Sequence, residues 1–214
     1  MVLKHQTAIV TGGSRGIGKA IALHLSAQGF NIVLSFKKDE KAAAQVVSDI
    51  QKSGGAAEMI RADLSLADSA NDITRTTIER FGRIDVLINN AGVSSNKSLI
   101  ADTPDLEWNE IIDVNLHGVF RMMKAVVPRM RQQKKGNIVN LSSNITKRLA
   151  PTFGPYAISK AALETPTPLA ATFIRPSSKP AKICFNPCPS TSPIKFEAGT
   201  FTLSNCTSPV SIPL

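Results

Sequence analysis

The chain has 214 residues, of which 43% are apolar and 19% are charged, and its formal net charge is +9. This length and apolar fraction predict one soluble globular domain with a sizeable core, to which a tail is appended. No apolar run approaches the roughly 20 residues that a membrane-spanning helix needs. The first residues, MVLKHQTAIV, also lack the apolar stretch and cleavage site of a signal peptide. We therefore expect a cytoplasmic protein without a membrane partner.

The positive charge raises the alternative of a nucleic-acid partner, since clustered Lys and Arg bind phosphate backbones. Residues 1–164 hold 21 of the 25 basic and 15 of the 16 acidic side chains, so +6 lies there and +3 in residues 165–214. The charge is thus spread thinly, and no interleaved aromatic platform accompanies it. We interpret it as a solvated basic surface and expect no nucleic-acid partner.

Short apolar runs alternate with segments of helical periodicity between residues 7 and 143. These runs are nearly continuous in apolar character, as expected of parallel strands covered on both faces. Apolar residues four apart, such as Ile17, Ile21 and Leu25, predict helices that face a sheet. The alternation predicts an α/β fold with a Rossmann-like doubly wound parallel sheet. The expected strands are TAIV (7–10), NIVLSF (31–36), AAEMIRA (56–62), RIDVLIN (83–89) and NIVNLS (137–142).

Several residues mark the expected ends of these helices. Gly29 and Gly82 follow helical segments, where a left-handed glycine commonly ends a helix. Ser65 together with Asp68 resembles an N-terminal cap, and an apolar stripe begins at Leu66.

The first expected strand leads directly into TGGSRGIG, residues 11–18, and then into a helix. Three glycines permit a tight turn, close approach of the backbone to a diphosphate and close helix–strand packing. The helix N-terminus also favours negative charge. Glycine-rich turns arise for structural reasons too, but after the first strand of an alternating chain they favour nucleotide binding. The residues expected to bind the nucleotide here are Gly12, Ser14, Arg15, Gly16, Ile17 and Gly18.

The end of the second expected strand indicates which nucleotide is bound. In dinucleotide folds an acidic residue at this place binds the ribose hydroxyls and repels a 2′-phosphate. Here Lys37 and Lys38 follow the strand, and the first acid is Asp39. Arg15 adds another cation near the same place, although exposed cations are most often solvated surface. This charge pattern favours NADP(H) over NAD(H).

Five separated motifs complete the pattern over about the first 164 residues: the glycine turn, NNAG at 89–92, Asn115, the pair Ser142-Ser143, and YAISK at 156–160. In this order they resemble the short-chain dehydrogenase/reductase family. The resemblance implies an oxidoreductase that moves hydride between the nicotinamide and a carbonyl or secondary alcohol substrate, and association as a homodimer or homotetramer. It also implies cofactor contacts by Asp63, alternatively a turn or cap acid, and by Asn89, Ala91, Gly92, Tyr156 and Lys160.

The last motif has a chemical rationale. A tyrosine hydroxyl has an ordinary pKa of about 10, so a nearby positive charge is needed to stabilise its phenolate near neutrality. Lys160 lies four residues after Tyr156, on the same helix face. The resemblance implies that Tyr156 is the general acid/base, Lys160 its electrostatic partner, Ser143 the donor to the substrate oxygen and Asn115 the support of a proton relay. Ser143 is preferred to Ser142 because of its spacing of 13 residues before Tyr156, and Ser142 is expected to point the other way.

The composition changes after residue 164. Nine of the 13 prolines lie in residues 165–214, and Pro166 and Pro168 should stop or kink the Tyr156 helix near Glu164 or Thr165. We therefore divide the chain into a dinucleotide-binding and catalytic domain at 1–164 and a divergent, Pro/Ser/Thr-rich tail at 165–214, expected to be irregular.

Two further patterns fall within this tail. Asn186-Pro187-Cys188 stands where the family places an Asn-Pro-Gly segment, and Cys184, Cys188 and Cys206 have no His or Asp cluster beside them, so no metal site is predicted. Three explanations stay open: a truncated or altered gene product, a divergent member with a different lid, or a catalytically impaired nucleotide-binding relic.

Overall fold

A computed structural model describes residues 6–148 and 150–164, together with short strands at 182–183, 195–197, 200–202 and 212–213. Its centre is a parallel sheet with the strand order β3-β2-β1-β4-β5-β6. This is the order of a Rossmann-like doubly wound fold, so the predicted fold class is confirmed. The strands are β1 (Thr7–Val10), β2 (Asn31–Phe36), β3 (Ala57–Arg61), β4 (Val86–Asn89), β5 (Asn137–Leu141) and β6 (Lys182–Ile183).

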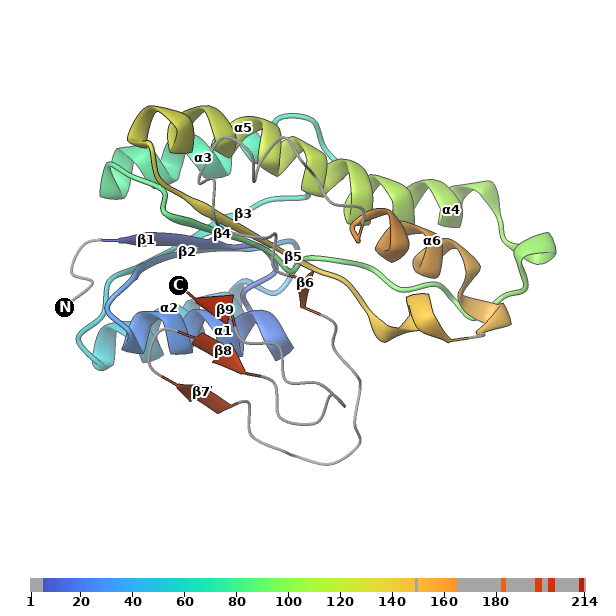
Figure 1. The fold of residues 1–214 in the computed structure, drawn as a ribbon, viewed down its shortest axis with the longest axis horizontal. Coiled ribbons are helices and arrows are strands. Elements are labelled where there is room, and N and C mark those ends of the chain that lie inside the picture. Colours follow the sequence, from blue (N-terminus) through green and yellow to red (C-terminus); the bar gives the residue numbers. More distant parts are fainter. Residues whose placement is uncertain are drawn as a thin grey trace.

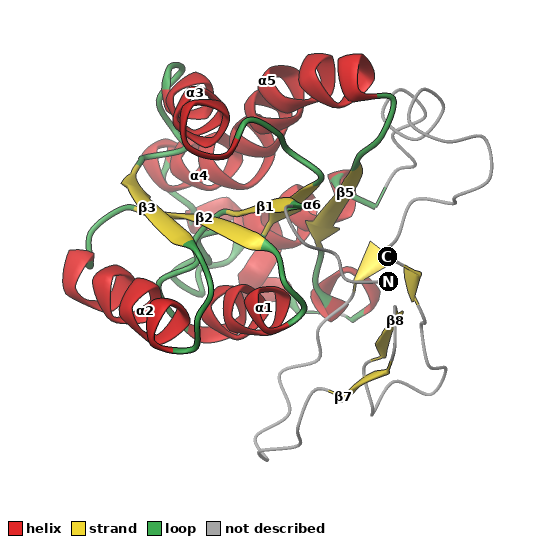
Figure 2. Ribbon diagram, turned by 90° about the vertical axis from the view of Figure 1, so that its left-hand side faces the viewer, coloured by secondary structure: helices red, strands yellow, loops and turns green. Residues whose placement is uncertain are grey.

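Helices cover both faces of this sheet (Figures 1 and 2). Helices α1 (Gly16–Ala27) and α2 (Glu40–Lys52) lie on one face, and α3 (Ser69–Phe81) and α5 (Gly118–Gln133) lie on the other. Helix α4 (Asp105–Ile112) continues through a π-helical turn, η2 (Asp113–His117), into α5. Helix α6 (Gly154–Ala162) lies against α4, and η1 (Ile100–Asp102), η3 (Asn144–Lys147) and η4 (Pro151–Phe153) are short 3-10 turns.

Alternate residues of the strands supply two separate apolar layers. Ala8 and Val10 pack in the cluster that includes α1 and α2, whereas Ile9 between them packs in the cluster that includes α3 and α5. All three side chains are fully buried, because both faces of a parallel sheet are covered. Full burial of a valine or isoleucine side chain stabilises the fold by about 1.5–3 kcal/mol.

The expected helix ends are partly confirmed. Gly29 and Gly82 have φ values of +89° and +75°, the left-handed conformation that glycine adopts most readily. The expectation for Ser65 is wrong: α3 begins at Ser69, and the Ser65 hydroxyl instead donates to Asp63 Oδ1 at 2.7 Å. The side chain of Asp68, at the N-cap position, makes no capping hydrogen bond.

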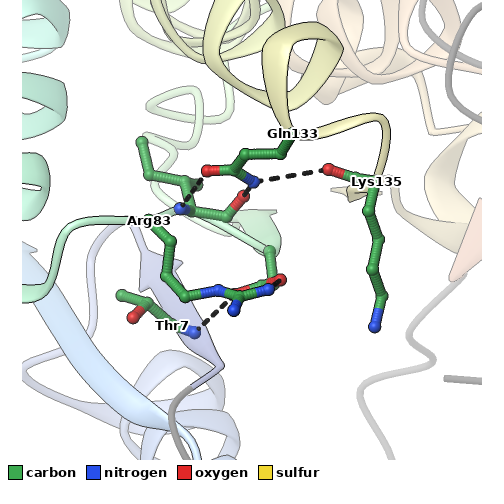
Figure 3. Close-up of polar contacts among 6 residues, drawn as sticks. Thr7, Arg83, Gln133 and Lys135 are labelled. Carbon is green, nitrogen blue, oxygen red and sulfur yellow. Dashed lines mark hydrogen bonds and ion pairs between the residues drawn. The ribbon is translucent and has the colours of Figure 1, made fainter.

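A polar network lies at the N-terminal ends of β1 and β4, opposite the strand ends where the sequence motifs gather (Figure 3). Asp85, only 2% exposed, accepts hydrogen bonds from the Thr7 backbone N–H at 2.9 Å and from both forks of Arg83 at 2.7 and 2.8 Å. Gln133 at the end of α5 bonds both backbone groups of Ile84. This network satisfies a buried carboxylate and joins β1, β4 and α5 at one place.

Helix α6 ends where the sequence predicts a break. Its last residue is Ala162, its C-cap is Leu163, and the chain forms a turn at Leu163 and Glu164. Pro166, Pro168, the segment 186–191 and the three cysteines lie outside the described residues.

Within residues 165–214 the described elements are β6 and three strands of a small antiparallel sheet, β7 (Lys195–Glu197), β8 (Thr200–Thr202) and β9 (Ile212–Pro213). The division at residue 164 and the irregular character of the tail stay predictions. In the described part of the chain, no helix is both long and apolar enough to cross a membrane.

Candidate active site

The sequence motifs gather at the carboxyl ends of β1, β4 and β5. The strand order reverses between β1 and β4, and in open α/β sheets the crevice at such a point is where ligands bind. The glycine turn follows β1, NNAG follows β4, and Ser142-Ser143 follows β5. Helix η2 with Asn115 and helix α6 with Tyr156 and Lys160 adjoin these segments.

The glycine turn has the backbone geometry of a phosphate-binding loop. Gly12 and Gly16 have positive φ values of +64° and +54°. A Cβ on Gly18 would lie 2.3 Å from the carbonyl oxygen of Gly12, so only glycine lets α1 begin this close to the turn. A Cβ on Gly13 would lie 2.6 Å from Leu34 Cβ, a requirement for glycine that the sequence analysis did not identify. The turn therefore presents backbone and the N-terminus of α1, with Ser14 half-buried and Arg15 and Ile17 exposed.

Asn90 holds this turn and was missed in the sequence analysis. Its Nδ2 donates to the carbonyl oxygens of Thr11 and Gly12 at 2.8 and 3.0 Å. Thr11 Oγ1 in return accepts from the backbone N–H groups of Asn90 and Ala91, each at 3.0 Å. Asn90 is the second residue of NNAG, so the motif contained the signal, but its partner is about 80 residues away and no local pattern indicates it.

Asn89, which was expected to bind the cofactor, lies within the sheet. It is 1% exposed, and its Nδ2 donates to Asn140 Oδ1 of the neighbouring strand at 2.8 Å. The structure thus gives Asn89 a contact between β4 and β5, whereas Ala91 and Gly92 follow in the crevice loop. A Cβ on Gly92 would lie 3.1 Å from Asn115 Oδ1 and 3.4 Å from Lys160 Nζ, which places this glycine beside the Tyr–Lys group.

Lys37 and Asp63 form a second group, at the ends of β2 and β3. Lys37 Nζ lies 2.8 Å from Asp63 Oδ2, so two residues with separately expected cofactor contacts pair with each other. Partial burial by itself would raise the pKa of Asp63, but hydrogen bonds from Lys37 and Ser65 outweigh it and lower that pKa below its ordinary value. Asp39 caps α2 by accepting from the Ala42 backbone N–H at 2.9 Å.

Asn115 lies in the π-helical turn that connects α4 with α5. Such turns insert an extra residue into a helix and occur often at functional sites. The side chain is fully buried, its Oδ1 accepts from Val93 N–H at 2.8 Å, and its Nδ2 donates to Val93 O and Ser159 Oγ at 2.9 and 3.0 Å. Asn115 thus joins the loop after β4 to helix α6.

Lys160 is a buried cation beside the tyrosine. It is 4% exposed, and its Nζ donates to Leu141 O at 2.9 Å and lies 5.9 Å from the centroid of the Tyr156 ring. Burial lowers the pKa of Lys160 from 10.5 to about 8. Tyr156, on the same helix one turn earlier, is half-buried.

The two adjacent serines have different partners. Ser142 Oγ lies 3.2 Å from Lys160 O and 2.8 Å from Glu164 Oε1, so it faces α6. Ser143 caps the 3-10 turn η3, where its Oγ accepts from the Ile145 backbone N–H at 3.3 Å. The structure therefore brings Ser143, Asn115, Tyr156 and Lys160 to one end of the sheet, and gives the two serines different hydrogen-bond partners.

These features fit a nicotinamide dinucleotide. The absence of a side chain at Gly18 lets α1 start against the turn, and a Cβ on Gly16 would meet nothing within 4 Å, so that side of the turn is open. Contacts connect this turn to Lys160, because Asn90 bonds the turn and Gly92 lies beside both Asn115 and Lys160.

Comparison with known proteins gives the same pattern. The family model "short chain dehydrogenase" matches residues 6–177. The chain is 41% identical to a 3-oxoacyl-(acyl-carrier-protein) reductase of Synechocystis sp. over 159 residues, which are 74% of this chain and 64% of the relative. It is 37% identical to 3beta-hydroxysteroid dehydrogenase 1 of Eggerthella lenta over 165 residues, 74% of this chain and 61% of the relative. The chain thus spans less than two thirds of the length of these relatives.

Solved structures of short-chain oxidoreductases have the same fold as this chain. A metagenomic short-chain oxidoreductase in complex with NADP superposes with a TM-score of 0.76 at 35% identity, covering 80% of this chain and 77% of that protein. A putative short-chain alcohol dehydrogenase from Sinorhizobium meliloti gives 0.74 at 33% identity, covering 79% and 67%. The family model, the sequence relatives and the fold with its motifs at one sheet edge agree, and the chain belongs to the short-chain dehydrogenase family.

Proposed function

We propose that this protein is an NADP(H)-dependent oxidoreductase that interconverts a ketone and a secondary alcohol. The observation that carries the proposal is the buried ammonium of Lys160, 5.9 Å from the Tyr156 ring, at the edge of the sheet that also bears Ser143 and the glycine turn. A buried lysine whose pKa is lowered by desolvation is typical of a site where charge changes during a reaction.

The proposed cofactor site runs from the glycine turn to α6. The exposed N-terminus of α1 would bind the diphosphate, while Lys37 and Asp63 would lie at the adenosine end and Lys160 at the nicotinamide end. When bound, the nicotinamide supplies or accepts the hydride. The proposed contacts are Gly12, Ser14, Arg15, Gly16, Ile17, Gly18, Lys37, Asp63, Ala91, Gly92, Tyr156 and Lys160; Asn89 is left out because its buried side chain bonds Asn140.

The proton step is assigned to Tyr156. In reduction, its phenolic O–H gives a proton to the substrate oxygen as the carbonyl carbon receives hydride, which leaves a phenolate; in oxidation the phenolate takes the proton back. With a pKa of about 8, Lys160 is mostly charged at neutral pH and stabilises that phenolate. The low-dielectric surroundings of a buried lysine strengthen this attraction.

Ser143 and Asn115 have supporting roles in the proposal. Ser143 Oγ accepts from Ile145 N–H, which leaves its own hydroxyl hydrogen for the substrate oxygen. Both amide hydrogens of Asn115 are taken by Val93 O and Ser159 Oγ. Asn115 is therefore proposed to support the proton relay by holding the loop after β4 against α6, and not to donate directly to the substrate.

The proposed substrate is a ketone such as a 3-oxoacyl thioester. The relatives named above include a 3-oxoacyl-(acyl-carrier-protein) reductase and a 3beta-hydroxysteroid dehydrogenase. The compounds in these two names differ, but each carries a ketone or a secondary alcohol. The common group is the one that Tyr156 and Ser143 would address. A 3-oxoacyl thioester is the first compound to test, because the reductase is the more similar of these two relatives.

Turnover by matched variants tests this function. We expect loss of NADPH absorbance that depends on a 3-oxoacyl thioester, a strong decrease with Tyr156→Phe, and a decrease of roughly 100-fold or more with Ser143→Ala, because one donor to the developing oxyanion is lost. Ser53→Ala, which changes an exposed serine at the end of α2, is the matched control and should retain the parent activity. NADPH binding without turnover across a panel of ketones would instead favour a non-catalytic nucleotide-binding protein.

A further inference from the structure

We propose that Glu164 is a positioning residue that holds the Ser143 segment against the C-terminal end of α6. Glu164 Oε1 accepts hydrogen bonds from Ser142 Oγ at 2.8 Å and from Thr146 Oγ1 at 2.7 Å. The two donors stand on either side of Ser143 in the chain. This inference rests on the proposed function, because it concerns how the same site is held in place.

The carboxylate is the preferred acceptor of both hydroxyl hydrogens. Each hydroxyl has one hydrogen and a second acceptor nearby: Lys160 O lies 3.2 Å from Ser142 Oγ, and Ser143 O lies 2.9 Å from Thr146 Oγ1. An ionised acceptor forms shorter and stronger bonds than a neutral carbonyl. The distances to Glu164 are the shorter ones in both cases, so the two hydrogens point to Glu164.

Helix α6 needs such a contact because it is short. It contains nine residues, and helices of this length are marginal unless tertiary contacts hold them. Lys160 is bonded to Leu141 O from the middle of the helix. Glu164, in the turn that follows the helix, adds the contact at its end and reaches the segment that begins right after β5.

The consequence is a rigid link between two parts of the proposed chemistry. Glu164 acts through the residues that flank Ser143, so it sets where the Ser143 hydroxyl lies relative to Tyr156 and Lys160. Loss of the link should move Ser143 while leaving the glycine turn, which lies on other elements, unchanged. The predicted effect is therefore on the carbonyl reaction and not on NADPH binding.

Kinetics of three variants test the link. We expect Glu164→Ala to lower kcat/KM for the ketone by roughly tenfold to 100-fold, because a displacement of about 1 Å between reacting groups can cost this much, with the Kd for NADPH unchanged. Glu164→Gln keeps an oxygen acceptor at the same place and should recover most of the loss. Glu79→Ala removes an exposed carboxylate from α3 and serves as the matched control, with parent activity expected.

Two results would overturn the inference: parent kinetics in Glu164→Ala, or a loss of NADPH affinity as large as the loss of turnover. A parent protein without turnover would refute the proposed function and leave the link to be decided by amide hydrogen exchange. The backbone N–H groups of Ile145 and Thr146 should then exchange faster in Glu164→Ala than in the parent and in Glu79→Ala. Equal exchange in all three proteins would contradict the link.

Discussion

At the scale of single residues, the burial of Lys160 makes the stability of the fold depend on pH. Burial of the ammonium favours its neutral form and lowers its pKa to about 8, compared with 10.5 for the ordinary side chain. Below the lower value both the folded and unfolded chains carry the proton, and the folded protein bears the full desolvation penalty. Between the two values the unfolded chain binds more protons, so this group makes stability rise with pH.

Replacement of Lys160 by Met should remove this dependence. Lys160→Met loses one hydrogen bond, but it also loses the penalty of about 3 kcal/mol for burying a charge. At pH 7 we therefore expect its free energy of unfolding to be higher than the loss of the hydrogen bond alone would give. The free energy of unfolding of the parent should rise relative to that of Lys160→Met as the pH increases from 8 to 10. Urea unfolding of both proteins across this range measures the difference, and a constant difference would contradict a lowered pKa.

The Lys37–Asp63 pair makes a second residue-scale prediction, on the choice of cofactor. Lys37→Ala should lower the preference for NADPH over NADH by about tenfold, because a charge-assisted bond to the 2′-phosphate is lost. Asp63→Asn should raise that preference by up to about fivefold, since Lys37 is no longer partly neutralised across 2.8 Å. The Kd values of both nucleotides for each variant give the answer, and an unchanged ratio in Lys37→Ala would exclude Lys37 as the 2′-phosphate ligand.

At the scale of secondary-structure elements, the site depends on bonds between loops that follow different strands. Asn90 fastens the turn after β1 to the end of β4, Asn115 fastens the loop after β4 to α6, and Glu164 fastens α6 to the segment after β5. Each bond uses one side chain to satisfy groups of two elements. These polar contacts, and not only the apolar core, therefore hold the loops at the carboxyl ends of the strands in position.

Substitution of Asn90 tests the first of these contacts. Asn90→Ala leaves the carbonyl oxygens of Thr11 and Gly12 without their donor, at a cost of about 1–3 kcal/mol, and should weaken NADPH binding. Asn90→Asp should be worse, because a carboxylate would face two carbonyl oxygens. The melting temperature and the Kd for NADPH measure both effects. If Asn90→Asp bound NADPH as tightly as the parent, the contact would not be what holds the turn.

At the scale of the whole molecule, the sheet and its helices follow from the sequence because their signals are local. Continuous apolar runs predict β1 to β5 within two or three residues at each end, and the prolines predict the early end of α6. The pairing of Lys37 with Asp63 and of Glu164 with Thr146 could not be predicted in this way. These partners come from different elements, and only the folded arrangement brings them together.

The same distinction applies to the Ser65 helix cap. A serine three residues before an acid matches a capping pattern locally, but in the fold Arg121 of α5 donates to the carbonyl oxygens of Leu64 and Ser65, each at 3.1 Å. The contact from Arg121 is tertiary, and α3 begins three residues later than the capping pattern indicates.

The central claim is that the chain moves hydride from NADPH to a ketone carbon with Tyr156 as the proton donor. Transfer of deuterium from NADPH labelled at the reactive nicotinamide carbon into the alcohol product tests it most directly. We predict labelled 3-hydroxyacyl thioester with the parent protein, and none above background with Tyr156→Phe although that variant binds NADPH. Unlabelled product, or no product from a parent protein that binds NADPH, would contradict the claim.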